Sequence, residues 1–154
     1  MTGRSLGLIA ALGSLGMMIA ALGFQYIGEL PPCKMCYWQR YPHIAAIGIG
    51  VLFLLFAYRG FLLLGALSAL TTGVTGVYHV GVEVKWWQGP DTCTSSSTDG
   101  LSVDQLLDQI MTAPLVRCDE IAWSLMGISM AGWNAIVSFA LAFLWVTAFS
   151  RFKA

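Results

Sequence analysis

Four long stretches without a charged residue constrain the fold of this chain more than any other feature. They lie between Arg4 and Glu29, Arg40 and Arg59, Arg59 and Glu83, and Glu120 and Arg151, and contain 24, 18, 23 and 30 residues. A helix needs about 20 residues to cross the hydrocarbon core of a bilayer, and it satisfies its own backbone hydrogen bonds there. The pattern predicts an all-α protein, a transmembrane four-helix bundle. We expect one membrane domain over residues 1–154, with spans near residues 6–27, 41–58, 61–82 and 121–149.

The composition excludes the main alternatives to a membrane protein. Hydrophobic residues make up 57% of the 154 residues and charged residues only 10%, against about 25% charged in an ordinary soluble domain. A small water-soluble globule cannot cover its surface with so few charges, and a disordered chain would be far less hydrophobic. The eight basic and eight acidic residues balance, so nothing indicates a nucleic-acid partner.

The distribution of charges predicts the orientation of the spans. Four spans put both termini on one side, and that side carries Arg4, Arg59, Arg151 and Lys153 without any acidic residue. Basic residues are enriched in cytoplasmic loops, so we expect both termini in the cytoplasm. The two outer loops, residues 28–40 and 83–120, then hold all four cysteines in a compartment that tolerates disulfides.

The longer outer loop contains the pattern of a short amphipathic helix. Ser102 and Gln105 have the spacing of a capping box at a helix start. Apolar residues then fall on one helical stripe at Val103, Leu106, Leu107, Ile110 and Met111. A helix of this kind lies either on the outer membrane surface or on the top of the bundle, and the sequence leaves both placements open.

Cys33 and Cys36 form a Cys-x-x-Cys motif, which is typical of a redox dithiol or of half a zinc site. Zinc would need two further ligands nearby, and the spacing of Cys93 and Cys118 matches no common zinc finger, so we expect no metal site. A plain structural disulfide is the remaining alternative for the motif.

The position of Cys36 favours a redox role over a structural one. It falls at the start of the second span, where free backbone N–H groups and the helix dipole favour a thiolate. Arg40 follows one helical turn later, and its guanidinium can stabilise both this sulfur and an oxyanion nearby. We therefore predict that Cys36 is the electron-donating thiolate; a lone interfacial arginine would instead contact lipid headgroups.

The second pair of cysteines differs from the first in its surroundings. Cys93 lies in a polar segment with turn residues, where another protein could reach it. Cys118 is flanked by Arg117 on one side and by two acidic residues on the other, and it lies where the chain re-enters the membrane. Two outer pairs of this kind suggest a relay by thiol–disulfide exchange, with two inert structural disulfides as the alternative.

Several side chains inside the spans are candidates for binding or packing. His79, near the outer end of the third span, either hydrogen-bonds a ligand carbonyl or is an ordinary interfacial histidine. His43 has no partner that the sequence identifies. Met130 either packs in the core or forms one wall of a cofactor site. Asn134 is expected to hydrogen-bond between helices. Small residues that allow close helix packing recur at Gly65, Ala69 and Gly73.

The chain resembles the DsbB family of bacterial membrane thiol oxidases in a combination of motifs that covers most of its length. These motifs are Pro32-Cys33-Lys34-Met35-Cys36-Tyr37-Trp38-Gln39-Arg40-Tyr41-Pro42, Cys93, Cys118-x4-Trp123-x3-Gly127 and Ser129-Met130-Ala131-Gly132-Trp133-Asn134. The resemblance implies a multi-pass protein of the bacterial inner membrane with periplasmic cysteine loops. It also implies that the protein reoxidises a soluble DsbA-like dithiol oxidase and passes the electrons to a quinone of the membrane pool, either ubiquinone or menaquinone.

The resemblance also implies roles for individual residues. Cys93 would receive the thiolate of the partner protein, and Cys118 would then attack the first pair. Cys33 would exchange with Cys118, and Cys36 would face the quinone beside Arg40. His79 is similar to a family histidine near the quinone.

Two other functions remain as alternatives. A vitamin K epoxide reductase-like enzyme is also a helical bundle with a quinone and cysteine pairs, but its quinone-proximal Cys-x-x-Cys lies near the last span. A structural membrane subunit with two static disulfides is the alternative outside the enzymes.

Overall fold

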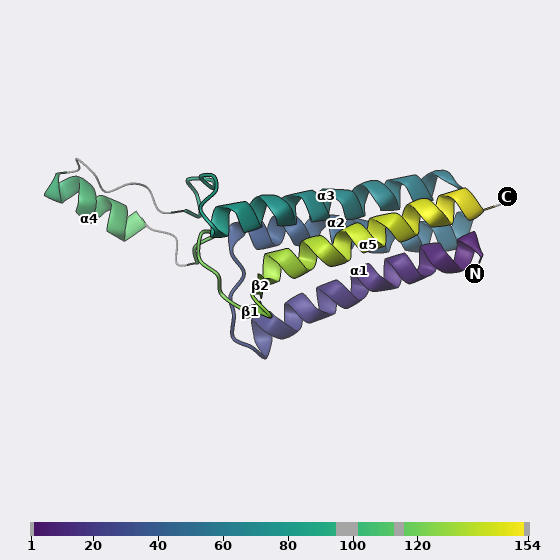
Figure 1. Ribbon diagram of the computed structural model, residues 1–154, viewed down its shortest axis with the longest axis horizontal. Coiled ribbons are helices and arrows are strands. Elements are labelled where there is room, and N and C mark those ends of the chain that lie inside the picture. The colour runs from purple at the N-terminus through teal and green to yellow at the C-terminus, as the bar shows by residue number, and fades with distance from the viewer. Residues whose placement is uncertain (1, 95–101, 113–115, 153–154) are drawn as a thin grey trace.

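A computed structural model of the chain describes residues 2–94, 102–112 and 116–152. Its long helices are α1 (Gly3–Tyr26), α2 (Lys34–Phe56), α3 (Gly60–Glu83) and α5 (Met130–Arg151). Each of these four is long and apolar enough to cross a membrane. The helices α2 and α3 pack side by side, α3 packs along α5, and α1 packs against α2 and α5. The predicted all-α transmembrane four-helix bundle is confirmed (Figure 1).

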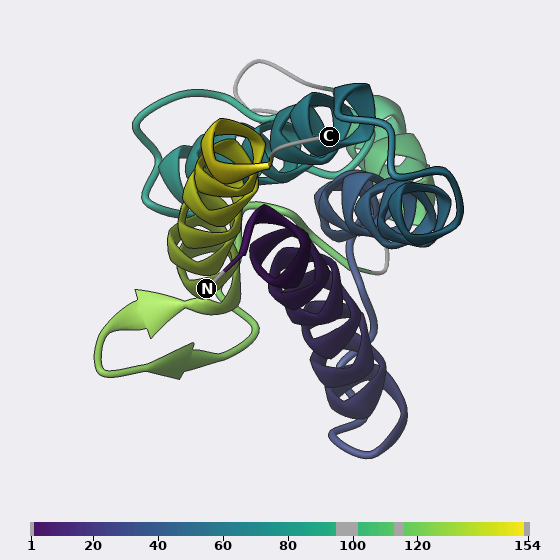
Figure 2. The same cartoon turned by 90° about the vertical axis from the view of Figure 1, so that its right-hand side faces the viewer.

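The two ends of the bundle differ in what they carry. Both termini lie at one end, next to the short connection between α2 and α3 (Figure 1). There the Arg59 guanidinium lies over the Phe149 ring and donates from Nε to the Phe149 carbonyl oxygen at 3.2 Å. The opposite end carries the start of α2, where Cys33 caps the helix and packs with Cys93 and Cys118. Helix α1 diverges from the other helices toward that end (Figures 1 and 2). Lys153, counted above with the basic residues near the termini, is outside the described residues.

Helix α2 begins seven residues earlier than the predicted span, at Lys34 rather than near residue 41. The reason is an N-cap made by a sulfur atom: Cys33 Sγ accepts a hydrogen bond from the backbone N–H of Cys36 at 3.2 Å. Pro42 lies inside the helix without ending it. Cys36 is therefore in the first turn of α2, as the sequence predicted, and the free N–H groups of that turn point toward the cysteine end.

Helix α5 begins nine residues later than the predicted span, so the start at residue 121 is wrong. Two short antiparallel strands, β1 (Ser124–Leu125) and β2 (Ile128–Ser129), come first. Met126 and Gly127 join them with φ angles of 54° and 77°, which are typical of a type I′ turn. Ser129 then caps α5, because its Oγ accepts from Gly132 N at 3.2 Å. An uncharged run of 30 residues thus contains a hairpin as well as a span.

The short helix α4 (Val103–Thr112) confirms the predicted amphipathic helix. Its capping box is present: Ser102 N donates to Gln105 Oε1 at 2.9 Å, and Gln105 N donates to Ser102 Oγ at 3.4 Å. The helix projects beyond the cysteine end of the bundle (Figure 1). The five residues of its apolar stripe are exposed.

The core near the termini is built around Trp145, which is fully buried together with Phe53 and Leu62. The predicted small residues of the third span allow this packing. A Cβ atom added to Gly65 would lie 2.6 Å from atoms of the Trp145 ring, a separation that real Cβ contacts do not show. Gly65 therefore sets how closely α3 and α5 approach.

We predict that Gly65→Ala destabilises the bundle, because the added methyl group must displace the Trp145 ring. Overpacking of this kind costs about 1–3 kcal/mol. The measurement is the unfolding midpoint of the purified protein in detergent. Gly16→Ala is the matched control, since a Cβ there meets no atom within 4 Å. Equal midpoints for the two variants would show that Gly65 does not limit the approach of the helices.

Candidate functional site

A cavity of about 350 Å³ lies at the cysteine end of the bundle. Its volume is within the range of small-molecule sites. Apolar side chains from α1 and α5, such as Met17, Phe24 and Val137, form much of its wall. The cavity brings together every residue that the sequence nominated for cofactor binding, namely Cys36, Arg40, His79 and Met130, and it also reaches Cys33.

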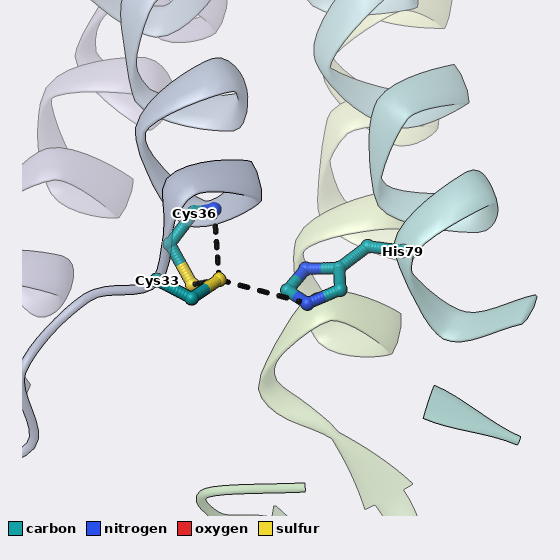
Figure 3. A group of neighbouring side chains, drawn as sticks. All are labelled: Cys33, Cys36 and His79. Atoms are coloured by element: carbon teal, nitrogen blue, oxygen red, sulfur yellow. Dashed lines mark hydrogen bonds between the residues drawn. The ribbon is translucent and has the colours of Figure 1, made fainter. Parts of the chain in front are cut away.

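Cys33 and Cys36 are free cysteines whose sulfur atoms lie 2.9 Å apart (Figure 3). Cys33 is buried, whereas Cys36 is partly exposed. The contact with the Cys36 sulfur, together with burial, raises the pKa of the Cys33 thiol. Cys33 is therefore harder to ionise than an ordinary thiol, and Cys36, which is partly exposed, is the sulfur of the pair that is better placed to react.

His79 connects the two cysteine pairs. Its Nδ1 accepts a hydrogen bond from Gln39 Nε2 at 2.8 Å, so the proton of the neutral ring is on Nε2. Nε2 lies 3.2 Å from the carbonyl oxygen of Cys118 and 3.7 Å from Cys33 Sγ (Figure 3). One imidazole N–H thus faces a backbone atom of one pair and a sulfur atom of the other.

A buried hydrogen-bond network continues from His79 into the bundle. Asn134 Nδ2 donates to Gln39 Oε1 at 2.9 Å and to Thr72 Oγ1 at 3.1 Å. Asn134 Oδ1 accepts from His43 Nε2 at 3.0 Å, which gives His43 the partner that the sequence did not reveal. The predicted role of Asn134 between helices is confirmed, because its partners belong to α2 and α3.

Gln39 is the network residue that the sequence analysis missed. It is buried and bonds to residues of both α3 and α5. Its position three residues after Cys36 places it on the same helix face. A polar amide on that face was the available signal, but only the fold identifies its partners.

Arg40 lines the cavity, and its guanidinium is hydrogen-bonded to residues of α1. Its Nη1 donates to Gln25 Oε1 at 2.6 Å and its Nη2 to the carbonyl oxygen of Ala21 at 3.2 Å. The guanidinium also lies 5.5 Å from the centre of the Tyr37 ring. Arg40 therefore connects α2 to α1 beside the Cys-x-x-Cys motif, rather than extending only toward headgroups.

Cys93 and Cys118 form a disulfide across a sequence separation of 25 residues. The sequence suggested that Cys93 is open to another protein, and this expectation is wrong for the disulfide-bonded form. Cys93 is 1% exposed, because Cys118 N also donates to the Cys93 carbonyl oxygen at 2.6 Å and holds the two segments together. The disulfide packs in one buried cluster with Cys33, Met35 and Val82.

An ion-pair clamp holds the segment that follows Cys118. Asp119 accepts from Lys85 Nζ at 3.0 Å and from Arg117 Nη2 at 2.8 Å. The Arg117 guanidinium, and then Lys85, lower the pKa of the Asp119 carboxyl well below its usual range. The clamp attaches this segment to the end of α3 and keeps Cys118 near the first pair.

Comparisons with known proteins agree with this arrangement. The family model described as disulfide bond formation protein DsbB matches residues 3–148. A disulfide bond formation protein B of Dechloromonas aromatica is 31% identical over 135 residues, which cover 82% of this chain and 79% of that protein. The protein of the same name from Verminephrobacter eiseniae is 32% identical over 148 residues, which cover 90% of this chain and 80% of the relative. No solved structure gives a significant match.

We predict that Asp119→Asn speeds reduction of the Cys93–Cys118 disulfide by a small thiol. The substitution removes the charge that holds Arg117 and Lys85, and a partly exposed clamp contributes up to about 1 kcal/mol. The expected gain in rate is therefore about fivefold, measured by alkylation of the released thiols over time. Asp104→Asn, a change of the same kind on α4, should leave the rate unaltered. An unchanged rate in Asp119→Asn would mean that the disulfide is protected without the clamp.

Proposed function

The chain belongs to the DsbB family of disulfide bond formation membrane proteins, and we propose that it is a protein dithiol:quinone oxidoreductase. It takes two electrons from a DsbA-like dithiol oxidase of the periplasm and passes them through its two cysteine pairs to a membrane quinone. The observation that carries this proposal is the shared cluster of Cys33, Cys93 and Cys118 beside the cavity. Two static disulfides would not require one open pair next to a cavity.

The orientation in the membrane follows from the same proposal. Arg4 at the start of α1, Arg59 between α2 and α3, and Arg151 at the end of α5 share the end with the termini. We place this end on the cytoplasmic side of a bacterial inner membrane. The cysteine end then faces the periplasm, where a soluble oxidase can reach it.

The first exchange transfers two electrons into the chain. A thiolate of the partner attacks Cys93 Sγ, and Cys118 leaves as a thiolate, which produces a mixed disulfide between Cys93 and the partner. The second thiol of the partner, as a thiolate, releases Cys93 and closes the disulfide of the partner. Because Cys93 is 1% exposed in the closed form, the segment around it must move before the partner can attack.

The second exchange moves the electrons to the first pair. When Cys33 and Cys36 form a disulfide, the Cys118 thiolate attacks Cys33, and Cys36 leaves as a thiolate. The Cys93 thiolate then attacks Cys118, Cys33 leaves as a thiolate, and the second disulfide is restored. The packing of Cys33 against the Cys93–Cys118 disulfide supports this route. His79 supports it as a positioning residue, since its Nε2 faces both Cys33 Sγ and the backbone of Cys118.

The cavity fits a quinone head group in its chemistry. A bound quinone, ubiquinone or menaquinone, supplies a two-electron, two-proton acceptor in a lipid-soluble form. Cys36 lines the cavity, and the Arg40 guanidinium can stabilise negative charge both on this sulfur and on an oxygen nearby. Met130 contributes to the wall, and the apolar side chains of α1 and α5 exclude water.

The test of the function is quinone-dependent oxidation of a reduced DsbA-like protein by the purified chain. We expect turnover with the wild-type chain and none with Cys33→Ala. With Cys118→Ala, the Cys93 thiolate should attack the disulfide of the oxidised partner, which reverses the second step of the first exchange, and an acid quench should trap the mixed disulfide at Cys93, because the second thiol of the partner is then the one group left to release it. Capture of the partner on Cys33 instead would reverse the proposed order of electron flow.

We predict that Arg40→Met slows quinone reduction 10–100-fold. A charge-assisted contact of this kind is worth about 1.5–3 kcal/mol, at about 1.4 kcal/mol per factor of ten. Arg40→Lys should lose less, because it keeps the charge without the planar fork. Single-turnover exchange between Cys93 and the partner should be nearly unchanged in both variants. Lys34→Met, which removes an exposed cation of the same segment, is the control. If Lys34→Met slowed quinone reduction as much as Arg40→Met, the effect would be one of general charge and not of the Arg40 contact.

A further inference from the structure

The free cysteines and His79 have the geometry of an incomplete metal site. Cys33 Sγ, Cys36 Sγ and His79 Nε2 all lie within 4.8 Å of one another (Figure 3). Zinc bonds sulfur at about 2.3 Å and histidine nitrogen at about 2.0–2.1 Å, so its ligand atoms in a tetrahedron are about 3.3–3.8 Å apart. Small side-chain rotations bring the three atoms to that spacing.

Glu83 is the candidate for a fourth donor; its carboxylate lies outside the group within 4.8 Å and has to rotate toward it. It follows His79 by one turn of α3, and its Oε1 lies 4.0 Å from His79 Nε2. The Glu83 side chain is 5% exposed, and its Oε2 has no hydrogen-bond partner among the described residues. A buried carboxylate oxygen without a donor is costly, and a cation would remove that cost.

We propose that Cys33, Cys36, His79 and Glu83 bind a thiophilic divalent cation, with Zn²⁺ as the best match, when the cysteine pair is reduced. Two thiolates and one carboxylate around a divalent cation leave one net negative charge. The Arg40 guanidinium at the same cavity balances that charge. Binding replaces the two thiol protons by the metal and transfers no electrons. The disulfide form offers no thiolate, so the site exists only in the reduced state.

Because the site exists only when the cysteine pair is reduced, a bound cation affects the redox chemistry of that pair. A bound cation takes one lone pair from each sulfur, which lowers the nucleophilicity of both thiolates and slows the closure of a disulfide. The cation therefore stabilises the reduced pair, and a chelator removes that stabilisation. This inference does not depend on the identity of the electron acceptor or of the partner protein.

Binding rearranges the network around His79 and gives up the present contact of Nε2 with the Cys118 carbonyl oxygen. A metal on Nε2 needs the ring proton on Nδ1, which now accepts from Gln39 Nε2. Rotation of the Gln39 amide by 180° presents its oxygen to Nδ1, and ligating histidines commonly donate to such an oxygen. The rotation gives up the present contacts of Gln39 with Met35 and Asn134, which weakens the site and keeps it reversible.

The sequence argument against zinc considered only the cysteines as further ligands. Cys93 and Cys118 are indeed paired with each other. The two missing ligands come instead from α3, as a histidine and a glutamate spaced by four residues, and only the packing of α3 against α2 brings them to the motif.

The test uses the full chain carrying Cys93→Ala and Cys118→Ala, so that only the first pair provides thiols. We expect the reduced protein to bind one Co²⁺ with the visible absorption of a tetrahedral thiolate site, and Zn²⁺ to displace it. X-ray absorption of the zinc form should show two sulfur atoms at about 2.3 Å and two lighter atoms at about 2.0–2.2 Å. The same protein oxidised to the Cys33–Cys36 disulfide should not bind.

The matched pair of variants separates a built site from simple dithiol chelation. Glu83→Gln should weaken zinc binding at least tenfold, whereas Glu120→Gln, whose carboxylate pairs with Arg117 at 3.2 Å, should leave it unchanged. His79→Gln provides a second variant if Glu83→Gln fails to fold. Wild-type affinity in both Glu83→Gln and His79→Gln, equal binding by the oxidised protein, or no binding by the reduced protein would overturn the proposal.

Discussion

The arrangement of side chains at the cysteine end depends on the hydrogen bonds of the Gln39 side-chain amide. This amide donates to His79 on α3 and accepts from Asn134 on α5. Both partners come from other helices, so each hydrogen bond fixes the position of one helix relative to α2. The orientation of His79, and with it the contacts to Cys33 and Cys118, follows from this one side chain. A stable site therefore requires a polar centre inside an otherwise apolar bundle.

The spacing of charges along the chain was sufficient to predict the four helices, because the cost of a charge in hydrocarbon does not depend on the details of packing. The ends of the helices were less predictable. Helix α2 starts at a cap made by Cys33 Sγ, and a cysteine is not among the usual capping residues. Helix α5 starts after a hairpin whose apolar residues resemble those of the span itself.

The sequence was sufficient to nominate the cysteines and Arg40 of the candidate site, but not to identify the contacts between helices that hold the site together. The Cys-x-x-Cys motif and Arg40 could be identified because their spacing along one helix is local. Gln39 and Glu83 could not, because their roles depend on side chains from other helices. The burial of Cys93 was missed for the same reason: its polar neighbours indicate exposure, and only its bond to Cys118 holds it against the bundle.

The disulfide between Cys93 and Cys118 also limits how far helix α4 can move from the bundle. It closes a ring over a separation of 25 residues, and α4 is part of that ring. In the chain-entropy model, closing a loop of this length restricts an otherwise free chain by about 3–4 kcal/mol. A thiol that reduces this bond would open the ring and leave α4 connected to the bundle through the chain alone. The reach of α4 from the bundle would then depend on the oxidation state of the two cysteines.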